Sequence, residues 1–154
     1  MPRLVESFRG VVYPWFCDFM GHMNTQFYCQ LFDGATLHFL AGIARRSELL
    51  AIDCGWVDLR QLIEYKHEVR SGELLVIRSH LTKIGNSSLG FLHEMRDTET
   101  ETLRATSEHV VALFSLAQID AADGCGAATR HGPHDRKLRD GAAHSYRRSW
   151  TLVA

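Results

Sequence analysis

The sequence predicts an α+β domain in which one curved antiparallel sheet of about five strands wraps around one long α-helix. Residues 25–45 have the apolar spacing of a helix, and the segments after them alternate with a period of two. Short turn sequences separate these alternating segments, as is typical of neighbouring antiparallel strands. The length of 154 residues suits a single domain.

The first expected strand covers residues 8–16, where β-branched and aromatic residues are frequent and Pro14 stands near the end. Residues 18–24 are expected to form a loop. Asn24 suits a helix N-cap because its side-chain oxygen can accept a hydrogen bond from an unpaired backbone N–H two or three residues later. The helix is therefore expected to begin at Thr25.

The expected helix carries two adjacent apolar stripes. They consist of Phe27, Leu31, Ala35, His38 and Gly42, and of Tyr28, Phe32, Ala35, Phe39 and Ile43. Together they form a face wider than a surface helix needs, so we expect this helix to be enclosed on more than one side. His38 would then be a hydrogen-bonded core histidine. Arg45 and Arg46 would end the helix, where its dipole favours positive charge.

Four further strands are expected after the helix. They cover residues 56–69, 74–81, 89–95 and 103–114, with turns at 70–73, 85–86 and 97–101. Short turns favour an antiparallel meander in which consecutive strands are neighbours. At period-two spacing, the four histidines of these segments would be scattered over both faces, which favours individual roles over one shared site. They are His67, His80, His93 and His109.

Composition excludes several classes of protein. The net charge of -1 argues against a dedicated nucleic-acid binder, which needs a basic face. No apolar run approaches the roughly 20 residues of a membrane span, and residues 1–10 lack the apolar centre of a signal peptide. The four cysteines show no Cys-x-x-Cys spacing. We therefore expect a cytoplasmic protein with reduced thiols, no metal and no cofactor.

Charge divides the chain into two parts. Residues 1–116 carry a net charge of -3, whereas residues 117–154 carry +2 and contain few large apolar side chains. So little apolar surface cannot offset the entropy of ordering this tail. We expect residues 1–116 to form the domain and residues 117–154 to form a poorly apolar extension, with one short helix near residues 134–140.

The most distinctive segment is residues 18–28, Asp-Phe-Met-Gly-His-Met-Asn-Thr-Gln-Phe-Tyr. It resembles the Asp-x-x-Gly-His-x-Asn-x-x-x-Tyr signature of the hotdog-fold acyl-CoA thioesterases, which include the 4-hydroxybenzoyl-CoA thioesterase type and the betainyl-CoA thioesterases. Further segments fit the same family, so the resemblance covers roughly residues 5–116. These segments are residues 12–15, 68–73, 87–89 and 102–105.

The resemblance implies the hotdog fold, which agrees with the order of elements read from the residues. It also implies self-association into dimers or tetramers. The active sites would lie at the dimer interface, with the loop and helix start of one chain facing strands of the other. The implied substrate is an acyl-CoA or, less favoured, an acyl-carrier-protein thioester.

Thioester hydrolysis needs a group that delivers water or a nucleophile and a group that stabilises the oxyanion. Asp18 can supply the first, either as general base or as nucleophile through a mixed anhydride. The backbone N–H groups near Asn24 and Thr25 can supply the second, because they lie at a helix N-terminus.

The resemblance suggests roles for other residues of the motif, each beside a simpler alternative. His22 and Asn24 would orient water or bind the substrate carbonyl, or they would be a solvated loop histidine and a plain N-cap. Gly21 would belong to the substrate-binding residues, or it would be required only for the shape of the backbone. Tyr28 would line the acyl pocket, or it would be a core residue.

The resemblance implies that the turn after the third expected strand lies near the nucleotide or the pantetheine of the bound CoA. Its residues are Asn86, Ser87 and Ser88. Lys83 or Arg78 could meet a phosphate.

Two other readings remain. A non-catalytic hotdog module would bind acyl-CoA without hydrolysing it, and a hotdog hydratase or dehydratase would use a different Asp and His pairing, which no segment here matches. Asp18 separates hydrolysis from simple binding. A binding module does not need a carboxylate at the helix start, where it would repel an anionic group.

Overall fold

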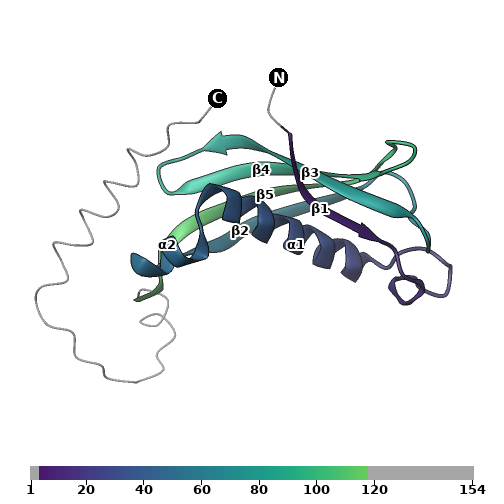
Figure 1. Cartoon of the computed structure of the whole chain (residues 1–154), viewed down its shortest axis with the longest axis horizontal. Helices are drawn as coiled ribbons and strands as arrows, with labels where there is room; N and C mark the ends of the chain where they lie inside the picture. The colour runs from purple at the N-terminus through teal and green to yellow at the C-terminus, as the bar shows by residue number, and fades with distance from the viewer. Residues whose placement is uncertain (1–3, 118–154) are drawn as a thin grey trace, which may run out of the picture.

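The computed structural model describes residues 4–117 (Figure 1). The expected tail helix near residues 134–140 lies outside the described residues. The elements in chain order are β1 (Val5–Val11), the 3₁₀ turn η1 (Pro14–Phe16), α1 (Thr25–Ile43), α2 (Arg46–Ala51), β2 (Cys54–Tyr65), β3 (Leu74–Ile84), β4 (Ser88–Asp97) and β5 (Leu103–Ser115).

The five strands form one antiparallel sheet in the order β1-β3-β4-β5-β2, and the sheet curves around α1 (Figure 1). The α+β prediction is therefore confirmed. The prediction that all consecutive strands are neighbours is wrong for β2, which pairs with β5 and forms an edge of the sheet. The link of residues 66–73 is long enough to cross the roughly 14 Å of three strand spacings.

The start of α1 follows the sequence prediction. The backbone N–H of Gln26 donates to Asn24 Oδ1 at 3.1 Å, so Asn24 is the N-cap. The predicted end is wrong, because Ala44 takes extended backbone angles and terminates α1 at Ile43. The backbone N–H of Arg45 donates to Glu48 Oε2 at 2.9 Å and starts the separate helix α2.

The first strand and β2 are also displaced from their predicted bounds. β1 lies between Val5 and Val11, and Pro14 begins η1 instead of ending a strand. Proline has no N–H for a strand ladder, and its fixed φ suits the first position of a helical turn. β2 ends at Tyr65, since the N–H groups of the next two residues both donate to Arg104 O.

One stripe of α1 packs into the concave face of the sheet. Its buried members include Tyr28, Phe32, Ala35 and Phe39. Within residues 4–117, nothing encloses the other side of the helix, where Leu37 is 64% exposed and His38 is exposed. The prediction of a core His38 is therefore wrong. The described residues cover α1 with a single sheet on one side, and not on more than one side as the sequence predicted.

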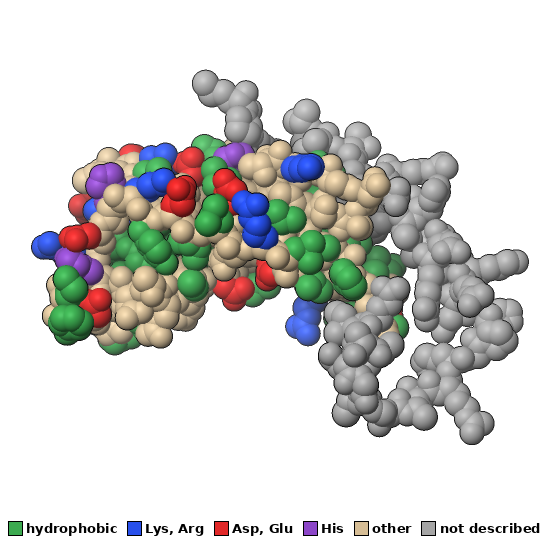
Figure 2. Space-filling model, turned by 180° about the vertical axis from the view of Figure 1, so that it is seen from behind, with side chains coloured by type: hydrophobic (Ala, Val, Ile, Leu, Met, Phe, Trp, Pro, Cys, Tyr) green, Lys and Arg blue, Asp and Glu red, His purple; other side chains and the backbone are tan. Residues whose placement is uncertain are grey.

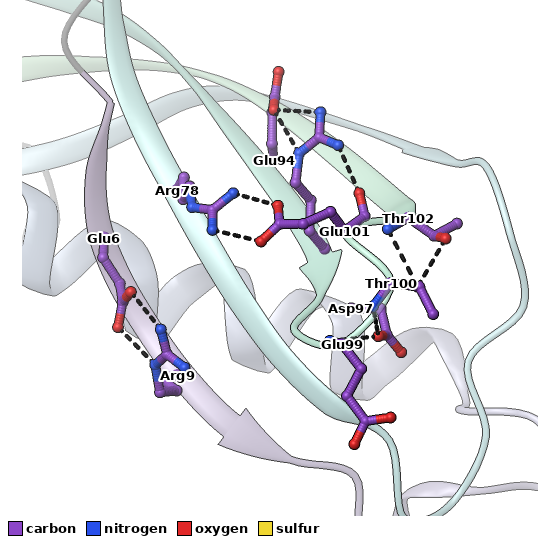
Figure 3. A network of polar contacts seen from close by, with 10 residues as sticks. Glu6, Arg9, Arg78, Glu94, Asp97, Glu99, Thr100, Glu101 and Thr102 are labelled. Atoms are coloured by element: carbon purple, nitrogen blue, oxygen red, sulfur yellow. Dashed lines mark hydrogen bonds and ion pairs between the residues drawn. The ribbon is translucent and has the colours of Figure 1, made fainter.

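The sheet face away from α1 carries paired charges (Figure 3). Arg78 binds the carboxylate of Glu101 with two hydrogen bonds of 2.6 and 2.8 Å, and Arg9 binds Glu6 in the same way. Arg78 is thus already occupied by a carboxylate, which removes the simplest reason to expect a phosphate on it.

Candidate active site

Residues 17–24 form a tight loop between η1 and α1. The N–H of Asp18 donates to His22 O at 2.9 Å, and the N–H of Gly21 donates to Asp18 O at 3.0 Å. Gly21 has a φ of 78°, in the left-handed region that a side chain disfavours. The loop therefore needs glycine here for its backbone path and holds Asp18 and His22 close together.

One oxygen of the Asp18 carboxylate is fixed by this loop. Asp18 Oδ1 accepts the backbone N–H of Met20 at 2.9 Å and, more weakly, that of His22 at 3.4 Å. Asp18 Oδ2 makes no hydrogen bond within residues 4–117. The half-buried carboxylate is thus held in position while one oxygen is available to a water molecule or a substrate.

His22 lies against an acidic residue that the sequence reading did not place in the site. His22 Nε2 is 3.0 Å from Glu68 Oε2, and the His22 side chain is 24% exposed. A single β-bridge also joins His22 to Arg70. Glu68 is far from the motif in the chain, and only the fold brings it to the loop. Its position in the family-like segment 68–73 was the single sequence signal.

The start of α1 offers fewer free N–H groups than the sequence suggested. The N–H of Asn24 donates to Phe16 O at 2.9 Å, and Asn24 Oδ1 is occupied by Gln26. The N–H of Thr25 has no partner in the described part of the chain. Thr25 is thus the backbone group at this helix end that can receive an oxyanion.

Tyr28 lies in the core behind the loop. Its side chain is 4% exposed and packs edge-on against Tyr65, with ring centroids 5.0 Å apart. Burial raises the pKa of Tyr28 to about 12, so its hydroxyl is neutral. Within one chain, Tyr28 supports the loop from inside.

The turn with Asn86, Ser87 and Ser88 is not brought to Asp18 within one chain. β3 begins beside the loop, where the N–H of Gly72 donates to Val12 O, and it ends at this turn. The strand is 11 residues long, which corresponds to roughly 35 Å. The turn and the α1 loop therefore lie at opposite ends of the sheet (Figure 1).

Two histidines predicted to have separate roles instead meet in the core. The ring centroids of His93 and His109 are 4.9 Å apart, and both side chains are buried. His93 Nε2 is 2.9 Å from Thr36 Oγ1, and its Nδ1 is 2.5 Å from Ser79 Oγ. The alternation of residues along one strand could not predict this contact, because the two histidines lie on different, neighbouring strands, β4 and β5.

Burial determines the charge of this pair. It lowers the pKa of His93 to about 3, and it lowers the pKa of His109 as well. His93 is thus neutral at ordinary pH and bridges α1 to β3. It is a structural residue, separate from the loop site.

Large apolar side chains are exposed beside Asp18. Phe19 is 98% exposed, Trp15 is 67% exposed and Met20 is 63% exposed. Figure 2 shows hydrophobic side chains next to acidic, basic and histidine side chains at this end of the molecule. This end therefore presents apolar surface and charge together.

Within residues 4–117, no group of three or more His, Cys, Asp or Glu side chains is placed to hold a metal ion. None of the helices found there has the length and apolar character required to cross a membrane.

Comparison with solved structures shows the same fold in other proteins. The protein SAV2348 from Staphylococcus aureus, solved in complex with CoA, aligns with a TM-score of 0.70 and 14% identity, covering 100% of this chain and 90% of that one. A 1,4-dihydroxy-2-naphthoyl-CoA thioesterase from Synechocystis, Slr0204, aligns with a TM-score of 0.63 and 15% identity, covering 72% of this chain and 82% of that one. At such identities these likenesses establish the hotdog fold.

Sequence comparison identifies the family. No curated protein matches the chain significantly. A model of the family described as the thioesterase-like superfamily matches residues 12–124, which include the loop, α1 and strands β2 to β5. Because this match spans well over half of the chain, the protein belongs to the thioesterase-like superfamily.

Proposed function

We propose that this protein hydrolyses an acyl-CoA thioester to the free acid and CoA, with Asp18 as the catalytic carboxylate. The observation that carries the proposal is the geometry of Asp18. Backbone N–H groups hold its Oδ1, while its Oδ2 makes no hydrogen bond within residues 4–117. This carboxylate lies on the loop that leads into α1, in a chain that belongs to the thioesterase-like superfamily.

Two routes through Asp18 are chemically complete. As general base, Asp18 takes a proton from water while the water oxygen attacks the thioester carbonyl carbon; the tetrahedral intermediate then expels CoA thiolate, and the proton on Asp18 is released to the thiolate or to solvent. As nucleophile, its oxygen attacks that carbon, CoA thiolate leaves, and water hydrolyses the resulting anhydride. In both routes the Thr25 N–H and the positive end of the helix dipole stabilise the oxyanion. His22 and Asn24 lie on the same loop, where they can orient the water or the carbonyl.

CoA esters are the favoured substrate class. The S. aureus protein of the same fold was solved with CoA, and the Synechocystis protein is a CoA thioesterase. The exposed apolar side chains beside Asp18 suit an acyl or pantetheine chain.

The active site is proposed to include a second copy of the chain. β2 is an edge strand whose outer side pairs with no other strand among residues 4–117, and its apolar side chains Leu59, Leu62 and Tyr65 are 57%, 47% and 50% exposed. Two copies that pair antiparallel along β2 would form one continuous sheet and satisfy the backbone groups of this edge.

Such pairing would also give the turn at residues 85–88 a place in an active site, although it lies far from Asp18 of its own chain. A two-fold axis reverses the strand direction, so the second copy presents its turn 85–88 at the edge of the extended sheet that carries the first copy's Asp18 loop. The predicted contacts of Asn86, Ser87 and Ser88 with the nucleotide or pantetheine would then be made to a substrate bound at the other chain's Asp18.

The test is thiol release from short, branched, aromatic and long acyl-CoA esters by the wild type and by Asp18→Asn. We expect wild-type turnover on part of this panel and a loss of at least ~10²-fold in the variant, the scale of a lost base or nucleophile. Asp53→Asn is the matched control, because Asp53 is an exposed acid outside the loop and asparagine tolerates its positive φ.

The results of this test distinguish hydrolysis through Asp18 from binding without hydrolysis. Full turnover by a folded Asp18→Asn variant would remove Asp18 from the reaction. A wild-type protein that binds CoA esters but releases no thiol from any of them would be the non-catalytic acyl-CoA-binding module.

A further inference from the structure

Glu68 has no part in the scheme above, although it lies in the β2–β3 link and contacts His22 of the Asp18 loop. His22 Nε2 and Glu68 Oε2 are 3.0 Å apart, which is hydrogen-bond distance. A carboxylate can only accept, so this contact favours a proton on Nε2. In the neutral ring, Nδ1 is then left as a hydrogen-bond acceptor.

The backbone on the Glu68 side of this pair is anchored. Arg104 Nη1 donates to Glu68 O at 2.9 Å, and the N–H of Met23 donates to Val69 O at 2.8 Å. Val69 is fully buried. Arg104 is itself held by Glu73 at 2.8 Å. The carboxylate of Glu68 thus extends from a fixed point in the link between β2 and β3.

The His22 side is anchored as well. His22 O accepts the N–H of Asp18, and a β-bridge joins His22 to Arg70 in the same link. Arg70 also lies 3.7 Å from the Glu68 carboxylate. The ring is therefore oriented by contacts on two segments that are distant in sequence.

We propose that Glu68 is a positioning residue for the thioesterase reaction: it holds His22 in the Nε2–H tautomer so that Nδ1 can accept a hydrogen bond from the attacking water. The water proton passes to Asp18, and no proton moves to Glu68. A carboxylate that fixes the tautomer and orientation of a histidine is an established device in hydrolytic sites. This inference rests on the proposed function, because it assigns His22 a task in that reaction.

The competing explanation is a surface ion pair that only ties the loop to the β2–β3 link. The Glu68 side chain is 63% exposed, and exposed ion pairs contribute little to stability. Stability alone therefore cannot identify a positioning role. A change of the His22 tautomer together with a loss of kcat can, because a pair that only ties the loop to the link would leave kcat unchanged.

The experiment compares Glu68→Ala and Glu68→Gln with the wild type. The ring ¹⁵N shifts of His22 are measured at pH 8.5 in protein labelled at histidine, and turnover is measured by thiol release. In Glu68→Ala we expect a mixture of the two tautomers and a kcat on the order of tenfold lower or more, with KM nearly unchanged. Glu68→Gln should keep the Nε2–H tautomer and most of the turnover, because its amide oxygen still accepts the bond.

Glu6→Ala is the matched control. The Glu6 side chain is also exposed, at 46%, and pairs with Arg9 at 2.8 Å on β1, at the other edge of the sheet. It should change neither the tautomer nor kcat.

An unchanged His22 tautomer in folded Glu68→Ala, or a kcat within twofold of the wild type, would overturn the proposal. A lower melting temperature with neither change would overturn it too, as the result of a purely structural pair. A wild-type protein that hydrolyses no thioester would instead refute the proposed function. The ¹⁵N shifts would still report how Glu68 orients His22.

Discussion

His22 and His93 show how the same side chain serves two different purposes in this fold. His22 lies on the loop before α1, 24% exposed, and faces the carboxylate of Glu68. His93 is fully buried in β4, between the hydroxyl groups of Ser79 and Thr36. The first is accessible to water and carries the chemistry that we propose, whereas the second is a neutral bridge between helix and sheet.

The difference between them lies in the surroundings. Hydroxyl groups can both donate and accept, so they satisfy a neutral imidazole in a site where a charge would be costly. The bridge continues to β1, because Ser7 Oγ lies 2.6 Å from Ser79 Oγ. His93 is thus part of the core structure, whereas His22 lies on the loop to which we assign the chemistry.

The largest difference between the two histidines is expected in the stability lost when each side chain is truncated to alanine. His93→Ala should lower the free energy of unfolding by about 3 kcal/mol, because it leaves a cavity and two buried hydroxyls without a partner. His22→Ala should cost less than about 1 kcal/mol, since the side chain is partly exposed and its ion pair is weak. Urea unfolding measures both values. Equal losses in the two variants would contradict the assigned roles.

Turnover should respond in the opposite way. His22→Ala is expected to lower kcat on the order of tenfold or more. A milder substitution, His93→Gln, should leave kcat nearly unchanged at a temperature where the variant is fully folded. A larger loss of kcat in His93→Gln than in His22→Ala would reverse the comparison.

Stability should depend on pH through His93. Its pKa of about 3 in the folded protein lies below the ordinary value of 6.5, so the unfolded chain binds the proton more tightly. The stabilisation from neutral His93 is therefore complete above pH 6.5 and is lost as the pH falls towards 3, by up to about 1.4 kcal/mol per pH unit. His109 and His80 are the titratable neighbours of His93.

Urea unfolding between pH 4.5 and 7 measures this slope. His93→Gln should flatten it, whereas His22→Gln should not. Hydrogen bonds from the turn at Thr100 lower the pKa of Asp97 to about 2, so its contribution is lost only below pH 4, outside this range. An identical slope in wild type and His93→Gln would show that His93 does not control acid stability.

The smallest expected effect concerns the start of α1. Asn24→Ala removes the cap on Gln26 and should cost about 1 kcal/mol, while Asn24→Asp should keep most of the stability. If Asn24 also binds substrate, turnover falls in Asn24→Asp although stability is retained. Equal turnover in Asn24→Asp and the wild type would limit Asn24 to capping.

Local chemistry explains what the sequence predicted. Asn24 begins α1 because its side chain caps the first turn, and Gly21 allows the loop that presents Asp18. Both effects act within a few residues, so they can be read from the chain. The order of helix and strands is also local, and it was sufficient for the fold class.

The features that the sequence did not predict depend on contacts between distant segments. β2 pairs with β5 at the sheet edge, and Glu68 reaches His22 only through the folded β2–β3 link. His93 and His109 meet because neighbouring strands place them side by side. Hydrophobic periodicity gives the face of each residue on its own element, but not the element that lies beside it.

The central claim is that Asp18 of one chain acts on a substrate held by the turn 85–88 of another. It is tested by mixing two variants, Asp18→Asn and the doubly acidic Asn86→Asp/Ser87→Asp, whose turn would repel phosphate. When equal amounts of the two variants pair at random, half of the dimers are mixed. Each mixed dimer has one intact site, formed by Asp18 of one chain and the unchanged turn of the other. About one quarter of all sites are then intact, so about one quarter of wild-type turnover should return. No recovery, in mixtures shown by mass spectrometry to contain mixed dimers, would contradict a site shared between two chains.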